Sequence, residues 1–329
     1  MTAGQDNFHS ATALHLSLSH NQPPPDSPAS EMSASLIESI LIDPSGKEVG
    51  LHLYNYSKES VAAHFYREQF SHQTNKSGEM HNKDEDTQAP RESVEAVEFF
   101  KNNLPCDAVI VELGGGRYQS RSGFPNRVFE NYIPLDISYT SIRCYVEIYG
   151  RPGVVSDACA LPFKDSSIDA FFTHTFLEHP TDPEQVLREI HRTLKPGGLV
   201  VHSDAWNCRW WQRHGVVGIK PFHLLTKKEA LVWLAAQVSE FKPVRLPATI
   251  LRRLVRLLTT PRRHPIGLRR GKLRPNYDLH LYQDEDAASS IDPTDLIMFY
   301  ESRCYRLIPQ LSFPQKVLFR HPNVYVQKP

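Results

Sequence analysis

Short apolar runs alternate with segments of helical periodicity between residues 92 and 205. The apolar runs lie at 108–111, 132–135, 153–155, 168–173 and 199–202. A helical spacing precedes the first run, at Val94, Val97, Phe100 and Leu104. Strands that alternate with helices in this way predict an α/β fold with a doubly wound, mostly parallel sheet.

The helix between the last two runs has clear start and stop signals. Asp182 is a natural N-cap, Pro183 occupies the first turn and Gln185 completes a pattern similar to a capping box. An apolar face follows, at Val186, Leu187, Ile190 and Leu194. The stretch 195–198, Lys-Pro-Gly-Gly, cannot continue a helix, so we expect the helix to end there.

Elements outside this region are predicted from local patterns. Apolar residues at 40–42 and 49–53 flank the turn-forming stretch 43–46, which favours a β-hairpin. Helices are expected over 57–70, from the capping box at 226–229 to about 234, and from Asp292-Pro293 towards Tyr305. The runs 317–319 and 324–326 predict an antiparallel hairpin at the C-terminus.

The composition divides the chain into five expected segments. Residues 1–36 are rich in Ser, His, Asn, Gln and Pro without apolar periodicity, and we expect a disordered tail. Residues 37–91 form a hairpin, a helix and a linker, and 92–205 form the core. Residues 206–315 are expected to form a cap or insertion, and 316–329 the hairpin that completes the sheet.

Charge and cysteine content limit the class of protein only weakly. Lys and Arg number 37, as do Asp and Glu, so the net charge says nothing about a polyanionic partner. The five cysteines form no C-x-x-C motif, which favours reduced thiols. The first arginine is Arg67, and no apolar run approaches the roughly 18 residues that cross a bilayer. We therefore expect a cytoplasmic protein.

A glycine turn follows the first apolar run, at Gly114, Gly115 and Gly116. Because glycines lack side chains, a ligand can touch the backbone there, and N–H groups before a helix favour a carboxylate or phosphate. Asp136 ends the next strand, at a position where an acid can bind both hydroxyls of a ribose. These features predict a nucleoside-bearing ligand.

Two classes of nucleoside ligand have to be separated. A dinucleotide-binding turn has the pattern G-x-G-x-x-G. Gly114 and Gly116 match its first two glycines, but Gln119 stands at the third position. The sequence beyond the turn favours a different family.

Further motifs follow the glycine turn in a fixed order. They are Glu112-Leu113-Gly114-Gly115-Gly116, Asp136, Ser156-Asp157-Ala158, Leu161-Pro162-Phe163, Ser167-Ile168-Asp169-Ala170, Phe176-Leu177-Glu178-His179 and Leu194-Lys195-Pro196-Gly197-Gly198. Over roughly 92–205 this series resembles the class I S-adenosylmethionine-dependent methyltransferases, in their small-molecule branch similar to methyltransferase type 11. The resemblance implies a Rossmann-like, mostly parallel sheet of seven strands with an antiparallel C-terminal hairpin, and S-adenosylmethionine as cofactor.

The resemblance also assigns residues to parts of that cofactor. Glu112 and the backbone of Gly114, Gly115 and Gly116 would hold the methionine moiety. Asp136 would bind the ribose, although a role as helix N-cap remains open for it. The remaining positions would be Ile137, Asp157 and Ala158 beside the adenine, and Thr173 and His174 on the methyl-donor side.

Two histidines are candidates for a catalytic base, because imidazole can accept a proton near neutral pH. His179 belongs to the Glu178-His179 pair, which is often structural in the family. His223 falls where relatives place substrate-side loops. The segment with Trp206, Trp210 and Trp211 is either a packed cap or one wall of an acceptor pocket. No ligand spacing of the H-E-x-x-H kind occurs, so no metal is expected.

A basic stretch runs from Arg252 to Arg274. It is either a solvated surface or a weak contact for an anionic membrane or nucleic acid. The candidate contact residues are Arg252, Arg253, Arg256, Arg262 and Arg263.

Three functions follow from these patterns. The first is direct displacement of a methyl group to a small-molecule acceptor, such as a natural product, a glycan precursor or a lipid-like compound. The second is methylation of RNA or another anionic macromolecule through the basic stretch. The third is a non-catalytic protein of the same fold, because Tyr118 stands where the family often has a third glycine.

Overall fold

The structure is a computed structural model of the 329-residue chain. It describes residues 39–41, 46–48, 51–53, 91–115, 129–214, 216, 222–260, 264–277 and 284–329. The expected tail over 1–36 and the expected helix over 57–70 lie outside these ranges.

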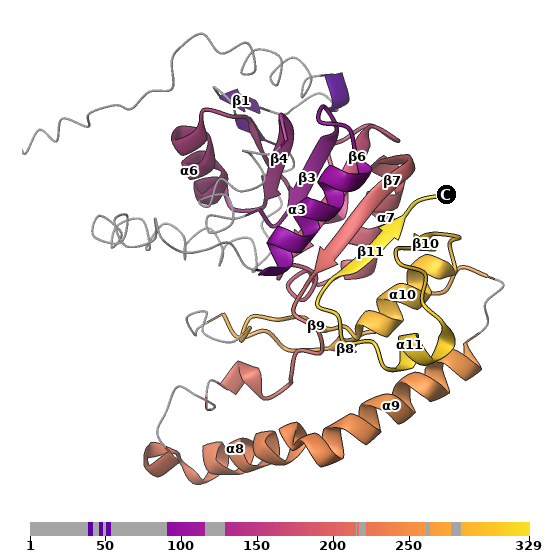
Figure 1. Ribbon diagram of the computed structural model, residues 1–329. Helices are drawn as coiled ribbons and strands as arrows, with labels where there is room; N and C mark the ends of the chain where they lie inside the picture. The colour runs from indigo at the N-terminus through magenta and orange to yellow at the C-terminus, as the bar shows by residue number, and fades with distance from the viewer. Residues whose placement is uncertain are drawn as a thin grey trace, which may run out of the picture.

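A mixed sheet forms the centre of the described structure (Figure 1). Its strands are β1 (Gly46–Glu48), β2 (Leu51–Leu53), β3 (Val109–Leu113), β4 (Asn131–Asp136), β5 (Gly153–Val155), β6 (Ile168–His174), β7 (Leu194–Ser203), β10 (Arg306–Leu307) and β11 (Val324–Gln327). Their order is β1-β2-β5-β4-β3-β6-β7-β11-β10. The strands from β2 to β7 run parallel, whereas β1, β10 and β11 are antiparallel to their neighbours.

This topology confirms the expected fold class. The seven strands β3, β4, β5, β6, β7, β10 and β11 form the mostly parallel sheet with an antiparallel end, and β1 and β2 extend it at the β5 edge. The chain moves outwards from β3 first through β4 and β5, and then in the other direction through β6 and β7. The strand order therefore reverses at β3, and in open α/β sheets ligands bind at such a point.

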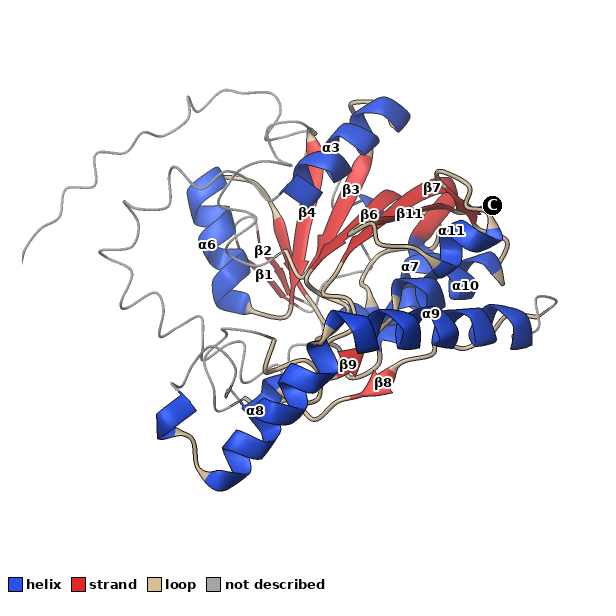
Figure 2. Cartoon of the chain, turned by 60° about the horizontal axis from the view of Figure 1, so that its bottom comes forward, coloured by secondary structure: helices blue, strands red, loops and turns tan. Residues whose placement is uncertain are grey.

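Helices cover both faces of the sheet (Figure 2). They are α3 (Arg91–Asn103), α6 (Tyr139–Tyr149), α7 (Pro183–Thr193), α8 (Lys227–Glu240), α9 (Lys242–Thr259), α10 (Pro293–Glu301) and α11 (Phe313–Val317). Short 3-10 turns η2 (Ala158–Ala160), η3 (Gln212–His214) and η4 (Phe222–Leu224) connect them, with a small ribbon of β8 (Gly271–Lys272) and β9 (Ser289–Ser290).

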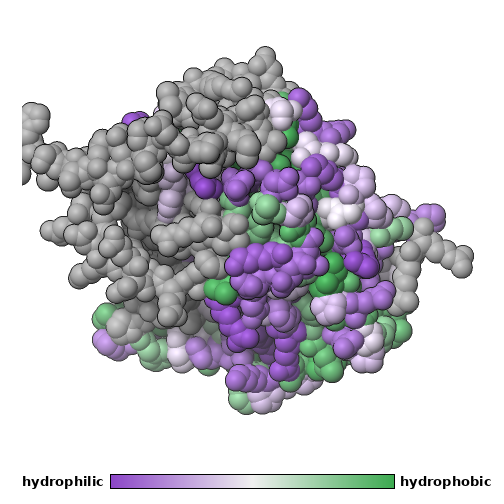
Figure 3. Space-filling view, turned by 45° about the horizontal axis from the view of Figure 1, so that its top comes forward, coloured by the Kyte–Doolittle hydropathy of each residue, from purple (hydrophilic) through white to green (hydrophobic). Residues whose placement is uncertain are grey.

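The two faces are built from alternate residues of the same strands, as the pleat of a β-strand requires. Ile110 of β3 packs with Phe100 of α3, whereas Val111 packs in a separate cluster with Leu187 of α7 and Phe299 of α10. Both faces are therefore buried, which explains the continuous apolar runs in the sequence. The face of the molecule seen in Figure 3 is mainly hydrophilic over its described residues.

The local signals at the ends of two helices are confirmed. The side chain of Asp182 accepts a hydrogen bond from the Gln185 N–H, and α7 ends at Thr193, immediately before the 194–198 stretch. Gly197 adopts a φ of +75°, which favours glycine. The capping box at Thr226 forms both of its hydrogen bonds, and α8 extends beyond the expected end to Glu240.

The N-terminal hairpin forms from different residues than expected. Its strands are β1 and β2, so the first strand is not 40–42. Ile40 and Leu41 are instead buried in the main core, where Leu41 forms a β-bridge with Phe163 and the Ile40 carbonyl accepts the Lys164 N–H at 2.9 Å. The apolar pair is therefore used for core packing, and the next polar residues form the strand.

The C-terminal hairpin also differs from the prediction. β11 is confirmed, but its hairpin partner is β10, and residues 313–317 form α11. Ser312 and Gln315 form a capping box with Pro314 in the first turn, a helix signal that the apolar run at 317–319 obscured.

The expected cap, 206–315, includes two elements that belong to the sheet domain. Leu296, Ile297 and Phe299 of α10 are buried in the main core cluster, and β10 belongs to the sheet. The part of 206–315 that lies outside the sheet domain therefore ends before α10.

Two further properties concern the whole described chain. None of the five cysteines forms a disulfide bond. Within the ranges that the structure describes, no helix is long and apolar enough to cross a membrane.

Candidate functional site

The ends of four strands form one edge because the strand register aligns them. Leu113 of β3 pairs with Leu135 of β4 and with Thr173 of β6, and Asp136 pairs with Val155 of β5. The parallel strands point towards β8, β9 and the α8–α9 pair, which lie beyond this edge (Figure 1). The residues predicted to bind the cofactor follow these strand ends.

The glycine turn is tightly packed. Gly114 has a φ of +69°, and a Cβ there would lie 2.4 Å from Cδ2 of Phe176. A Cβ on Gly115 would lie 2.9 Å from Cβ of Pro134. Gly114 therefore requires glycine for its conformation and for space, whereas Gly115 requires it for space alone.

The N–H groups of this turn differ from the expectation. Gly114 and Gly115 both donate to the carbonyl of Leu135, at 2.9 and 3.2 Å. These two amides hold β3 to β4, so they are not available to a ligand carboxylate. Gly116, Tyr118 and Gln119 lie outside the described residues.

Glu112 is the most unusual group at this edge. Its side chain is fully buried, and neither carboxylate oxygen has a hydrogen-bond partner among the described residues. Burial, and next the charge of Asp136, raise the pKa of Glu112 well above its ordinary value. A buried carboxylate without a partner is costly, so this position favours a cationic or hydrogen-bond-donating group of a ligand.

Asp136 lies at the end of β4 and begins the turn into α6. Its Oδ1 accepts the Ser138 N–H at 2.8 Å, and Ser138 is the N-cap of α6. The N-cap is therefore Ser138 rather than Asp136, and Asp136 supports the turn that leads into the helix. A carboxylate has four acceptor sites, so one such bond is compatible with ribose binding. Ile137, between the two, is half-buried.

Asp157 and Ala158 follow β5 in the same way. Asp157 is exposed, and its Oδ1 accepts the Cys159 N–H at 2.8 Å, which caps η2. Ala158 is buried at the start of that turn. Both residues lie at the predicted edge, and the carboxylate of Asp157 is accessible.

Thr173 is linked into a buried network that the sequence did not predict. Its hydroxyl donates to Oδ2 of Asp204 at 2.9 Å and lies 2.8 Å from Nδ1 of His202. Nε2 of His202 lies 2.7 Å from the hydroxyl of Tyr300 in α10. The Thr173 hydroxyl is thus engaged inside the protein rather than presented at the edge.

Asp204 is the functional residue that the sequence reasoning missed. Its Oδ1 accepts the N–H groups of Phe176 and Leu177, at 3.0 and 3.1 Å. It therefore fixes the turn after β6, and with it the Phe176 ring against Gly114. An acid directly after the run at 199–202 was the available signal.

His174 lies beside this network, at the end of β6. It is half-buried, and Nδ1 is 3.2 Å from Oγ of Ser203. Burial lowers the pKa of His174 despite the nearby charge of Asp204. Its imidazole is therefore neutral at pH 7 and able to accept a proton.

Residues 111–202, which span the glycine turn and β7, match the family model of a methyltransferase domain. Curated relatives agree. Malonyl-[acyl-carrier protein] O-methyltransferase 1 of Coxiella burnetii is 29% identical over 116 residues, which are 33% of this chain and 37% of that protein. An uncharacterized methyltransferase of Mycobacterium tuberculosis is 46% identical over 102 residues, which are 30% of this chain and 40% of that protein. Residues 111–202 therefore form a methyltransferase domain.

The matched segment is only part of these proteins, since the chain spans about two fifths of the length of both relatives. Among solved structures, YcgJ of Bacillus subtilis aligns over 69% of this chain and 76% of its own, with 14% identity and a TM-score of 0.38. Methyltransferases of this family and fold use S-adenosylmethionine as methyl donor.

His179 of the methyltransferase domain is held between acids. Its Nδ1 lies 3.2 Å from Asp286 and its Nε2 lies 3.6 Å from Glu178. Burial opposes the charged imidazole, but the hydrogen bond to Asp286 and the charges of Glu178 and Asp286 outweigh it and raise the pKa of His179 to about 9. His179 is therefore already protonated at neutral pH, which argues against the role of a base.

The Glu178–His179 pair instead joins the domain to its cap. The Glu178 carbonyl accepts the N–H groups of Ala288 and Ser289, and its side chain accepts the Ala205 N–H at 3.4 Å. Burial raises the pKa of Glu178 to about 8, against the attraction of His179. The pair thus holds the strand that enters α10 against the turn after β6.

We expect the thermal stability of the protein to fall as the pH rises from 6.5 to 9. A histidine with a raised pKa stabilises the folded state fully below its unfolded pKa of about 6.5, and this contribution is lost through about pH 9. The pKa of Glu178 is raised as well, so its contribution to stability also falls as the pH rises. A His179→Gln variant cannot gain the proton, so its unfolding midpoint should decline less in calorimetry across this interval. Equal slopes for both proteins would contradict the assignment.

His223 does not join the other candidates. It is exposed on η4, and the adjacent Phe222 packs on Trp233 of α8 with ring centroids 5.0 Å apart. No described contact ties His223 to the strand ends. The role of acceptor base therefore gains no support from the structure.

The three tryptophans are in different environments. Trp206 is partly buried against the core and donates from Nε1 to the Pro322 carbonyl at 2.6 Å. Trp211 is buried, whereas Trp210 is 52% exposed. Trp206 also lines a cavity at the end of β7, whereas Trp210 and Trp211 are not among the residues that line it.

Three arginines of the basic stretch lie on the side of α9 that faces the protein. Arg252 and Arg253 bind Asp292 at 2.7 and 2.9 Å, and Arg256 pairs with Asp295. Apolar residues lie on the outer side of α9 instead, and Leu251 and Leu258 are exposed. These three arginines therefore neutralise the buried carboxylates of Asp292 and Asp295, although the side chain of Arg252 remains 41% exposed. Arg262 and Arg263 lie outside the described residues.

Proposed function

We propose that the protein transfers a methyl group from S-adenosylmethionine to a small-molecule acceptor. The observation that carries this proposal is Glu112, a buried carboxylate without a partner beside the glycine turn. Inserted into this edge, the α-ammonium group of the methionine moiety would supply the missing donors. The family match is consistent with the same ligand.

The residues of the edge fit the parts of this molecule. Glu112 would bind the ammonium group, and Asp136 the ribose hydroxyls by charge-assisted hydrogen bonds. Exposed Asp157 would reach the amino group of the adenine, with Ile137 and Ala158 beside the ring. Gly114 and Gly115 would let the chain pass closely under the methionine moiety, although their own N–H groups are occupied.

S-adenosylmethionine supplies a methyl group on a sulfonium, which leaves as a neutral thioether when an acceptor atom displaces it. The chain would contribute alignment of the two reactants and exclusion of water. Where the acceptor has to lose a proton, His174 is the better-placed neutral imidazole among the described residues at this edge.

A small acceptor is favoured over a macromolecule. Three of the arginines that suggested RNA or membrane contact, Arg252, Arg253 and Arg256, are paired with Asp292 and Asp295. The named activity of the Coxiella relative, O-methylation of a malonyl group on a carrier protein, is also directed at a small reacting group.

An Asp136→Ala variant should bind S-adenosylmethionine about 1–3 kcal/mol more weakly, through lost charge-assisted hydrogen bonds. Titration calorimetry measures this difference directly. Asp136→Asn is the matched control for the start of α6, since its amide oxygen still accepts the Ser138 N–H but carries no charge. Unchanged affinity in folded Asp136→Ala would refute the ribose assignment. Absence of any binding by the folded wild type would refute the proposed function.

A further inference from the structure

A cavity of about 470 Å³ opens beside the end of β7. One wall follows β7 at Trp206 and Arg209, a second is the first half of α9, and a third is the segment 317–322 that leads into β11. β11 runs antiparallel to β7, with Val324 opposite His202. The cavity, which we call the basic cavity, therefore lies at the carboxyl edge of the sheet, beyond the end of β7.

The charges that line the basic cavity are almost all positive. They belong to Arg209, Lys242, Arg245, Arg253 and Arg320, and no Asp or Glu is among its lining residues. Behind this lining, Glu240 pairs with both Arg209 and Arg245, and Asp292 pairs with Arg253. Two arginines thus share one carboxylate, which leaves positive charge in excess.

Lys242 and Arg320 add to this excess. Both are exposed, and neither forms an ion pair within the described ranges. Arg253 has a different role, because it is 6% exposed and donates to the carbonyls of Val317 and Phe319, at 3.2 and 2.6 Å. It fixes the third wall, while Lys242 and Arg320 remain available for a ligand.

Apolar side chains complete the cavity. Trp206, Leu246, Ile250 and Phe319 line it together with the basic residues. The indole of Trp206 is held by its hydrogen bond to Pro322. Ligand sites typically combine such an apolar wall with a few polar groups that orient the ligand.

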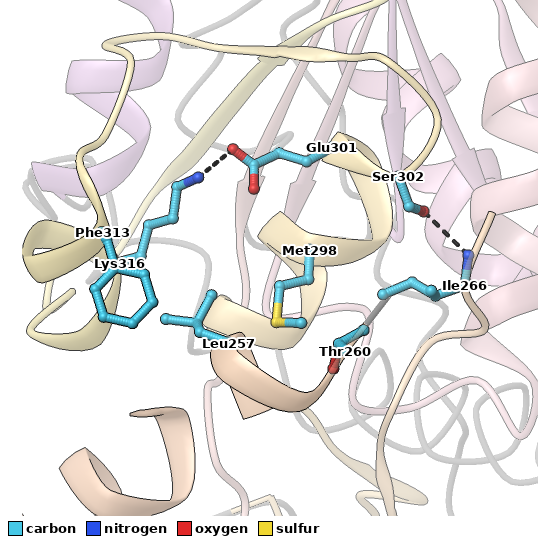
Figure 4. A pocket seen from close by; sticks show the side chains of 8 residues that line it. All are labelled: Leu257, Thr260, Ile266, Met298, Glu301, Ser302, Phe313 and Lys316. Carbon is cyan, nitrogen blue, oxygen red and sulfur yellow. Dashed lines mark hydrogen bonds and ion pairs between the residues drawn. The ribbon is translucent and has the colours of Figure 1, made fainter. Parts of the chain in front are cut away.

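A second cavity, of about 330 Å³, differs from the basic cavity in the charges that line it (Figure 4). It lies between α9, α10 and α11, where Lys316 points towards Glu301 and pairs with it. Ser302 accepts the Ile266 N–H at 3.1 Å. Its charges compensate each other, so no comparable preference for an anion arises there.

We propose that the basic cavity binds the anionic group, a carboxylate or a phosphate, of the methyl acceptor, while the apolar part of the acceptor packs against Trp206. The identification of the ligand as the methyl acceptor rests on the proposed function, whereas the binding of an anion in this cavity does not. One segment after β7 contributes to both places, since Asp204, which fixes Phe176 against Gly114, lies two residues before Trp206.

The test uses the full-length protein and two aromatic probes, phenyl phosphate and phenylacetate, with benzyl alcohol as the neutral comparison. Binding is followed by ligand-observed NMR at low and high salt. We expect an anionic probe to bind, more weakly as salt rises, and benzyl alcohol to bind much less. The stronger of the two anions identifies the preferred group.

A double variant, Lys242→Ala with Arg320→Ala, should weaken binding of the anionic probe about tenfold or more. Lys228→Ala, which removes an exposed lysine from α8, is the matched control and should leave it within about twofold of wild type. Both positions of the double variant are exposed, so circular dichroism should show an unchanged fold.

Calorimetry with S-adenosylmethionine on the same proteins separates the two proposals. Loss of probe binding with intact cofactor binding in the double variant supports the anion site. Equal probe binding by the double variant and the control, or no preference for the anionic probes, overturns it. A wild type that binds the anion but not S-adenosylmethionine would instead overturn the proposed function alone.

Discussion

Replacing Glu112 by Gln should stabilise the ligand-free protein and weaken cofactor binding at the same time. The folded state raises the pKa of this carboxyl, so the folded state holds its proton longer than the unfolded state does. Stability therefore falls as the pH rises above the unfolded pKa of about 4.3. Gln is neutral at every pH, and at pH 8 its free energy of unfolding should exceed that of wild type by about 2 kcal/mol.

The same substitution should lower the affinity for the cofactor. Loss of the charge that faces the ammonium group should weaken S-adenosylmethionine binding by about 3 kcal/mol, roughly a hundredfold. Urea unfolding at pH 5 and pH 8, without and with ligand, measures both effects. The gain in stability should be small at pH 5 and larger at pH 8. A gain that is the same at both pH values would show that the charge of Glu112 is compensated inside the protein.

Replacing Asp204 by Ala should have the largest effect on stability, a loss of about 3–5 kcal/mol. Asp204 is buried, and its removal leaves the N–H groups of Phe176 and Leu177 and the hydroxyl of Thr173 without their acceptor. Urea unfolding at pH 7 measures the loss. Cofactor affinity should fall as well, because Phe176 loses its fixed position against Gly114.

The pH dependence of this loss of stability should show that the charge of Asp204 causes it. Burial opposes ionisation of Asp204, but hydrogen bonds and charge from His202, with the two backbone N–H groups, outweigh it and lower its pKa. A lowered pKa stabilises above the unfolded value and is lost as the pH falls, so the effect of Asp204→Ala should shrink in acid. Asp182→Ala, which removes the N-cap of α7 and two long ion pairs of its half-exposed side chain with Arg188 and Arg270, is the control and should cost about 1 kcal/mol. A similar loss in both variants would contradict the network role.

Strong local patterns predicted the sheet domain well. The apolar runs became β3, β4, β5, β6 and β7 because parallel strands buried on both faces need uninterrupted apolar sequence. Asp182 and Thr226 began their helices because each supplies an acceptor to backbone N–H groups that would otherwise be unpaired. Glu112 was predicted from the family's motifs and Asp136 from its position at the end of a strand, and the strand register places both at one edge.

Features that depend on tertiary contacts were missed or wrong. Leu41 was assigned to a strand, but it bridges to Phe163, 122 residues further along the chain. The arginines of α9 were expected to face solvent, but their partners Asp292 and Asp295 are about 40 residues away, and no local pattern shows such pairs. Asp204 was overlooked because its role depends on the turn after β6.

The stretch that matches the methyltransferase family does not contain all the strands of the sheet. The recognisable stretch, 111–202, includes neither β2, which pairs with β5, nor β11, which pairs with β7. Cut at those ends, both strands would become open edges whose backbone groups could pair with another chain. The face covered by α10 would also be exposed. The family match therefore covers only the inner strands, while the sequence on both sides of it supplies the strands and the helix that close the sheet domain.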